Sequence, residues 1–249
     1  ARNLPGGSGL LIERLQNELG DAVQTRSEVE SVIADDHSVT IRFRQGNHFR
    51  SLTSRYVLVA TPAYVSARII SNLPGETHDA LSRIPYGPFI VAGIGTNERR
   101  VMPWDNIYTM IVADKSFNVF SNQANVLRSP GRARRPGGSL MLYSGGPWAE
   151  TLWALEDAVI EERYLADLES IYPGTRAIVS EVKIQRWEQA IPYLAPGRHK
   201  LQGAIEKPLG RLFLAGDYFD HPSMEAAVIP AMEAARSIRS RLACEAGSH

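Results

Sequence analysis

The stretch RLFLAGDYFDHPSMEAAVIPAMEAARSIRSRLA, residues 211–243, decides the fold. It predicts an apolar strand, a turn at Gly216 and Asp217, and a long helix that Ser223 caps. In open α/β sheets ligands bind beyond the carboxyl ends of the strands, where a glycine allows close backbone approach and an acid supplies an acceptor. The free N–H groups of Met224 and the two residues after it favour an anion or a carbonyl-rich ring edge. The alternative is an ordinary strand, turn and capped helix that binds nothing.

The composition describes a globular protein of ordinary balance. The 249 residues allow one large domain or two small ones, with 44% hydrophobic and 22% charged residues. A net charge of zero argues against nucleic acid or an anionic membrane as a partner. The single cysteine, Cys244, excludes an internal disulfide framework and fits a reducing, cytoplasmic location. No apolar run reaches the length of a membrane span, so we expect no transmembrane segment.

The rest of the chain predicts α/β (α+β) edges around a strand-rich middle. Apolar residues at helical spacing predict a helix over 10–19, which Gly20 ends. The continuous apolar run at 54–60 is typical of a buried parallel strand. Alternation and turn residues predict further strands, and helical spacing predicts two more helices. The strands are expected at 22–25, 29–34, 39–44, 89–95, 107–112, 140–144 and 178–187, and the helices from Pro62 to Ile70 and over 155–171.

Several familiar motifs are absent or weak. No G-x-G-x-x-G follows a strand, and the PGGSG at residues 5–9 is rejected because no strand precedes it. The arginine-rich segment 125–139 predicts an exposed basic loop, with a nucleic-acid patch as the weaker alternative. No histidine pair or cysteine cluster indicates a metal. His221 is the histidine to watch, because it lies beside the candidate site.

Five stretches together resemble a known family. They are LPGGSGLLIERLQNELGD, VQTRSEVESV, YVLVATPAYVSARII, RWEQAIPYLAPGR and RLFLAGDYFDHPSMEAAVIPAMEAARSI, in this order along nearly the whole chain. The sequence is similar to the flavin-containing amine oxidase superfamily, which includes monoamine oxidases, protoporphyrinogen oxidases and phytoene-desaturase-like enzymes. The resemblance implies FAD as cofactor and a Rossmann-like FAD-binding domain interleaved with a mixed-sheet substrate domain. We expect the FAD-binding part at 1–84 and 187–249, and the substrate-binding part at 85–186.

The resemblance also implies roles for particular residues. Val29 matches the strand residue whose backbone meets the adenine, and Pro62 lies near the adenosine and pyrophosphate. Gly216 and Asp217 match the turn that contacts the diphosphate and ribityl chain. Ser223 and Met224 match the helix start that faces the flavin pyrimidine oxygen. Trp187 matches the wall beside the flavin ring, with a role as a core aromatic left as the alternative.

The superfamily begins with a βαβ unit that carries G-x-G-x-x-G, and this sequence begins where the middle of such a protein would. We therefore expect a C-terminal portion, a cleaved product, or one subunit that needs an N-terminal FAD-binding partner chain or segment. Without that half, the chain alone should bind FAD poorly.

The resemblance implies an FAD-dependent oxidoreductase that transfers a hydride from an amine or other C–H substrate to non-covalent flavin. Gln189 stands where monoamine oxidases attach flavin through cysteine. Ala190 and Ser223 lie near the positions of the two cage tyrosines of monoamine oxidases. The lysine that amine oxidases hold near the flavin would fall at about Val91. These departures keep open a desaturase-type or protoporphyrinogen-oxidase-type reaction, or a non-catalytic subunit. No residue is assigned as catalytic acid or base, and the small-molecule substrate is not specified.

Overall fold

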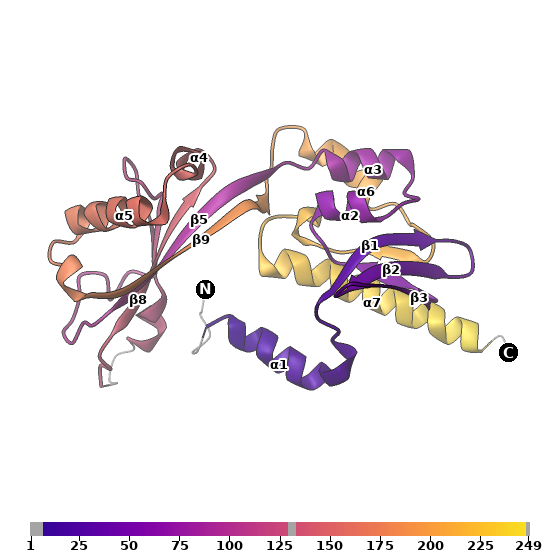
Figure 1. Cartoon of the computed structure of the whole chain (residues 1–249), viewed down its shortest axis with the longest axis horizontal. Helices are drawn as coiled ribbons and strands as arrows, with labels where there is room; N and C mark the ends of the chain where they lie inside the picture. Colours follow the sequence, from indigo (N-terminus) through magenta and orange to yellow (C-terminus); the bar gives the residue numbers. More distant parts are fainter. Residues whose placement is uncertain (1–6, 129–132, 248–249) are drawn as a thin grey trace. The chain divides into compact units, whose positions relative to one another are not determined.

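The computed structural model describes residues 7–128 and 133–247, which form two compact units (Figure 1). Unit 1 comprises Ala1–Gly20 and Gly87–Ala190, and unit 2 comprises Asp21–Tyr86 and Ile191–His249. The helix α1 (Gly9–Leu19) groups with unit 1, whereas the prediction placed it in the FAD-binding part. Which unit serves the cofactor and which the substrate stays a prediction.

Unit 2 contains two small sheets with helices. Its antiparallel sheet has the order β1-β2-β3, and its parallel pair is β10-β4. The strands are β1 (Ser27–Ala34), β2 (Val39–Gln45), β3 (His48–Ser54), β4 (Val57–Val59) and β10 (Leu212–Leu214). The helices are α2 (Ala63–Ile69), α3 (Gly75–Ser82), α6 (Gln202–Ile205) and α7 (Met224–Ala246), with 3₁₀ turns η1 (Gly20–Ala22), η4 (Arg198–Leu201) and η5 (Asp217–Phe219).

One hydrophobic core holds unit 2 together. Val59 and Leu214 contribute from the parallel pair, Ala63 and Ile69 from α2, and Leu81 from α3. From the parallel pair, Val57, Val59, Leu212 and Leu214 pack in this core, and Leu58 and Phe213 on the other face are half-buried. This packing fixes the place where β4 and β10 end.

Unit 1 is built on a five-stranded sheet with the order β6-β7-β8-β5-β9. Helix α5 buries Ile160, Tyr164 and Leu168, which recur at i, i+4 and i+8, in the core of the unit. The strands are β5 (Tyr86–Thr96), β6 (Thr109–Ile111), β7 (Val119–Asn122), β8 (Gly138–Gly145) and β9 (Val179–Pro192). The remaining elements are α4 (Pro147–Leu152), α5 (Asp157–Ile171), η2 (Gln123–Leu127) and η3 (Arg176–Ile178).

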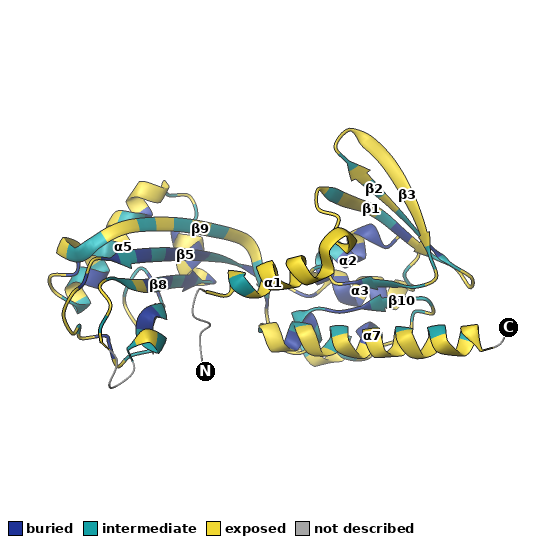
Figure 2. Ribbon diagram, turned by 90° about the horizontal axis from the view of Figure 1, so that it is seen from below, coloured by how far each residue is buried: buried dark blue, intermediate teal, exposed yellow. Residues whose placement is uncertain are grey.

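The capped helix after Ser223 and the helix over 10–19 are present, and the parallel strand predicted at 54–60 is present over Val57–Val59, since Ser54 belongs to β3. The predicted strand at 22–25 is wrong. There η1 ends at Ala22, residues 23–25 have no regular structure, and Arg26, whose φ of 56° breaks an extended path, precedes the start of β1 at Ser27. Strand β3 was not predicted, because its residues are exposed along nearly the whole strand and show no buried face (Figure 2).

The segment 87–190 leaves unit 2 through Tyr86 and returns at Ile191. Within unit 2 the N–H of Tyr193 donates to the carbonyl of Pro85 at 2.7 Å. The outgoing and returning chains are therefore hydrogen-bonded neighbours at the margin of unit 2.

Candidate functional site

The candidate site lies in unit 2, where the two parallel strands end. Val57, Leu58 and Val59 of β4 pair with Leu212, Phe213 and Leu214 of β10. The pairing continues one step further, because the N–H of Ala215 donates to the carbonyl of Val59 at 3.0 Å. Thr61-Pro62 and Gly216-Asp217 consequently emerge at the same edge of the sheet. This edge is where open α/β sheets bind their ligands.

Gly216 is required here by a neighbouring ring. A Cβ at this position would lie 2.3 Å from Cε1 of Tyr218, whose side chain is buried. The φ of 164° is extended backbone, so that any residue could adopt it. The glycine therefore lets the chain turn tightly over Tyr218, which is a packing reason independent of any ligand. The close approach of a ligand predicted for Gly216 stays a prediction.

Asp217 presents a half-buried carboxylate beside this turn. Burial raises its pKa above the usual value, and the neighbouring backbone N–H groups only partly offset the effect. Among the described residues no lysine, arginine or histidine forms an ion pair with it. A carboxylate held in this way fits an acceptor for ligand hydroxyl groups.

The start of α7 completes the site with main-chain donors. Ser223 Oγ accepts the N–H of Ala226 at 3.1 Å, which confirms Ser223 as the N-cap. The N–H of Ala227 is bonded to the Ser223 carbonyl. In the described part of the chain, the N–H groups of Met224 and Glu225 have no such acceptor, as expected for the first turn. These two donors and the helix dipole favour a negatively charged or carbonyl-rich group.

A short hydrogen-bonded chain leads into this cap. Asp220 Oδ2 lies 2.8 Å from Nδ1 of His221, and His221 Nε2 lies 3.0 Å from Ser223 Oγ. His221 and Asp220 are both exposed. The sequence had pointed to His221 only through its position next to the turn.

Tyr86 secures Pro62 on the other side of the site. Pro62 is the N-cap residue of α2, and the N–H of Ala63 donates to the Tyr86 hydroxyl at 3.0 Å. Burial raises the pKa of Tyr86 to about 12, with the charge of Asp217 acting in the same direction. The hydroxyl therefore stays protonated at neutral pH. Nothing in the sequence around Tyr86 signalled this role.

Two of the predicted site residues belong to other elements. Val29 sits in β1 opposite Phe43 of β2, next to an irregularity in the strand pairing, and is 37% exposed. Trp187 lies on β9 in unit 1 and is 53% exposed, so its reading as a core aromatic is wrong. The structure thus brings together Pro62, Gly216, Asp217, Ser223 and Met224.

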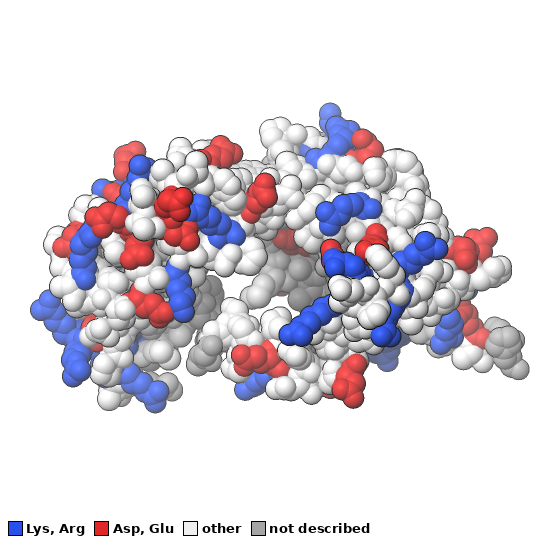
Figure 3. All heavy atoms as spheres, in the orientation of Figure 1, with Lys and Arg blue, Asp and Glu red and all other residues white. Residues whose placement is uncertain are grey.

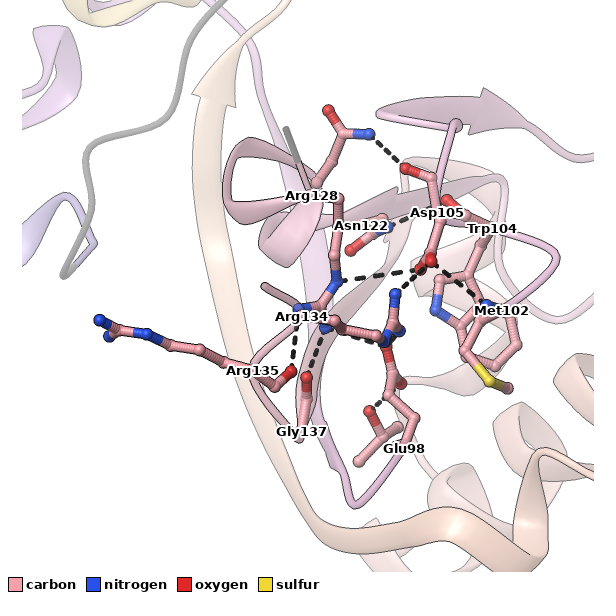
Figure 4. A network of polar contacts seen from close by, with 11 residues as sticks. Glu98, Met102, Trp104, Asp105, Asn122, Arg128, Arg134, Arg135 and Gly137 are labelled. Carbon is pink, nitrogen blue, oxygen red and sulfur yellow. Dashed lines mark hydrogen bonds and ion pairs between the residues drawn. The ribbon is translucent and has the colours of Figure 1, made fainter. Parts of the chain in front are cut away.

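The arginine-rich segment differs from the exposed loop that the sequence predicts. In unit 1 the side chains of Arg128 and Arg134 are 6% and 18% exposed and both reach Glu98 and Asp105 (Figure 4). Arg128 Nη2 lies 3.2 Å and Arg134 Nη2 lies 2.9 Å from Glu98 Oε1, and Arg134 also pairs with Asp105. Residues 129–132 lie outside the described part of the chain.

Because Arg128 and Arg134 are held in this cluster, their charges are not available on the surface to bind nucleic acid. On the face that Figure 3 displays, basic and acidic side chains are interspersed. Across residues 7–128 and 133–247, no group of three His, Cys, Asp or Glu side chains could hold a metal ion. No helix in the same ranges has the length and apolar character needed to cross a membrane.

The fold is that of flavin-dependent oxidases. A cyclohexylamine oxidase from Brevibacterium oxydans superimposes with a TM-score of 0.77 at 18% identity, over 95% of this chain and 53% of that one. A wild-type putrescine oxidase bound to putrescine gives 0.74 at 15% identity, over 94% and 53%. A putative protoporphyrinogen oxidase from Exiguobacterium gives 0.73 at 18% identity, over 94% and 51%.

The sequence comparison agrees. The family model for flavin-containing amine oxidoreductases matches residues 2–239, and the chain belongs to this family. Flavin-containing amine oxidase A of Bos taurus is 26% identical over 229 residues, and that of Canis lupus familiaris is 27% identical over 259 residues. These matches cover 86% and 97% of this chain but 41% and 47% of the relatives, so that the chain spans about half of their length.

Proposed function

We propose that the chain contributes the flavin-facing wall and the substrate-binding part of an FAD-dependent oxidoreductase, which transfers a hydride from an amine to non-covalent FAD. One observation carries the proposal. Pro62, Gly216-Asp217 and the N-terminus of α7 converge at the carboxyl edge of the β4–β10 pair. Bound FAD would supply the redox chemistry.

The residues of this edge fit the parts of FAD. The Asp217 carboxylate suits the ribityl hydroxyls, and Pro62 with its neighbours suits the adenosine and pyrophosphate side. The N–H groups of Met224 and Glu225 suit a ring edge that becomes more negative on reduction. Val29 is proposed for the adenine and Trp187 for the wall beside the ring. Gln189 offers no thiol, which supports a flavin held without a covalent bond.

The site needs a second half that cradles the diphosphate. The parallel pair has only two strands among the described residues, and β4 has no neighbour on its other edge. We propose that an N-terminal segment or partner chain with the nucleotide-binding βαβ unit adds to that edge. The exposed Cys244 supports a cytoplasmic location.

Flavin retention tests the proposal. FAD is added to the chain alone and to the chain assembled with the segment or partner that supplies the βαβ unit, and bound flavin absorbance is measured after gel filtration. We expect weak retention by the chain and stable retention by the assembly. An assembly that retains no flavin would overturn the proposal.

Asp217→Ala should weaken retention at least tenfold, whereas Asp36→Ala in the exposed β1–β2 turn should not change it. Equal retention by the two variants would contradict the role of Asp217.

A second candidate is dehydrogenation of a porphyrinogen or a polyene. It is favoured by Ala190 and Ser223, which offer no aromatic ring where monoamine oxidases place their two cage tyrosines. Hydrogen peroxide release with panels of amines, porphyrinogens and polyenes decides between the two. Release with amines alone would rule out the second candidate.

A further inference from the structure

The cap of α7 contains a titratable group whose charge changes the direction of a hydrogen bond. Ser223 Oγ already accepts the N–H of Ala226, and His221 Nε2 lies 3.0 Å from the same oxygen. Asp220 Oδ2 lies 2.8 Å from Nδ1 of His221. An ionised Asp220 only accepts, so the neutral imidazole carries its hydrogen on Nδ1 and leaves Nε2 as an acceptor. Ser223 must then donate its hydroxyl hydrogen to His221.

Uptake of a proton at Nε2 reverses this arrangement. The imidazolium donates from both nitrogens, to Asp220 and to Ser223 Oγ. Ser223 Oγ then accepts from His221 and Ala226, which uses both of its lone pairs. Its own hydrogen is released and can turn toward a ligand at the helix start. The same event adds one positive charge within hydrogen-bonding reach of the cap.

We propose that His221 is a positioning residue that couples reduction of bound flavin to uptake of a proton from solvent, through Ser223. The inference rests on the proposed function, since it needs flavin at the N-terminus of α7. Reduction increases the negative charge of the flavin, and the imidazolium together with the freed Ser223 hydroxyl stabilises that charge. Two electrons enter the flavin, and one proton moves from solvent to Nε2 of His221 in addition to any proton the flavin itself takes up.

Charged side chains of both signs lie on the elements around the cap. Acids outnumber bases on η5, on the first turn of α7 and around the cavity of about 520 Å³ that Asp220 lines, and Arg198 of η4 is a further base, bonded to the Tyr218 carbonyl. These groups are Asp217 and Asp220, Glu225, and Glu206, Glu233, Lys207 and Arg241 across the cavity. Lys207 is paired with Glu76, and Arg241 is stacked on Phe213. Histidine is the side chain that changes charge near neutral pH.

The midpoint potential of the bound flavin, measured against pH in the complete FAD-loaded assembly, tests the inference. In the pH range where histidines titrate, we expect the slope to correspond to one more proton per two electrons in the wild type than in His221→Gln. The difference is about 30 mV per pH unit for a two-electron couple. His48→Gln on the exposed strand β3 is the matched control and should behave as the wild type.

Substitutions of Ser223 distinguish proton coupling by His221 from a purely structural role of His221. Ser223→Ala should lose most of the additional proton uptake although His221 is intact, and Ser223→Thr should restore it, because threonine keeps the hydroxyl and the cap. A slope that His221→Gln leaves unchanged would overturn the inference while the bound flavin still supports the proposed function. Absence of bound flavin in the assembly would overturn both.

Discussion

Replacement of Glu98 by glutamine should severely destabilise unit 1. The Glu98 side chain is 1% exposed and accepts hydrogen bonds from Arg128, Arg134 and Thr96. Glu98→Gln leaves two buried guanidinium groups with the single carboxylate of Asp105. Breaking a buried ion pair by removing one partner costs about 3–5 kcal/mol. With a urea dependence of about 2 kcal/mol per M, the unfolding midpoint should fall by about 2 M.

Tryptophan fluorescence reads this unit selectively. The four tryptophans of the chain, Trp104, Trp148, Trp153 and Trp187, all belong to unit 1. The matched control is Glu162→Gln in the same unit. Glu162 pairs with Arg176 on the surface, with side chains 66% and 39% exposed, so its loss should cost at most about 1 kcal/mol. The reasoning is refuted if Glu98→Gln shifts the midpoint no more than the control does.

Three further changes test the site in unit 2. Gly216→Ala forces its Cβ against the Tyr218 ring and should lower the free energy of unfolding by about 1–3 kcal/mol, measured by urea unfolding with circular dichroism. The control Gly203→Ala meets no atom within 4 Å and should not destabilise the chain. Equal unfolding midpoints for the two variants would contradict the packing role of Gly216. Ser223→Ala should lower the free energy of unfolding by about 1 kcal/mol relative to the exposed control Ser240→Ala, because the helix loses its cap. A smaller loss of stability at Ser223 than at Ser240 would exclude capping. The raised pKa of Asp217 means that its contribution to stability is fully present below the ordinary aspartate pKa and is lost as the pH rises through the raised value. Asp217→Asn should therefore stabilise the flavin-free chain at neutral pH while weakening FAD retention, and a variant that is less stable at pH 7 but not at pH 3 would show the opposite sign.

Local sequence patterns predicted the parts of the fold in which one face is buried. The apolar run ending at Ala60 and the apolar strand before Gly216 have no polar interruptions. Because these two strands pair, Pro62 and Gly216 lie at the same edge of the sheet. Strand β3 could not be predicted in this way, since neither of its faces is buried.

The position of the arginines could not be predicted either. Arg128 meets Glu98 30 residues earlier in the chain, and Arg134 meets Asp105 29 residues earlier. No local pattern links residues so far apart, and the same composition is equally typical of a solvated loop. The role of Tyr218 beneath Gly216 shows a similar limit, because the sequence indicates a glycine at the turn but not the ring that excludes a side chain there.

The hydrogen bond from Tyr193 N–H to the Pro85 carbonyl holds the exit and the return of segment 87–190 next to each other. A segment with adjoining ends can be shortened, enlarged or exchanged without opening the scaffold that carries it. Segment 87–190 therefore has the form of an insertion that can be exchanged as a unit. Chimaeras that carry the corresponding segment of a relative should keep the core of unit 2 intact, so that one scaffold could accept different insertions at the same pair of adjoining ends.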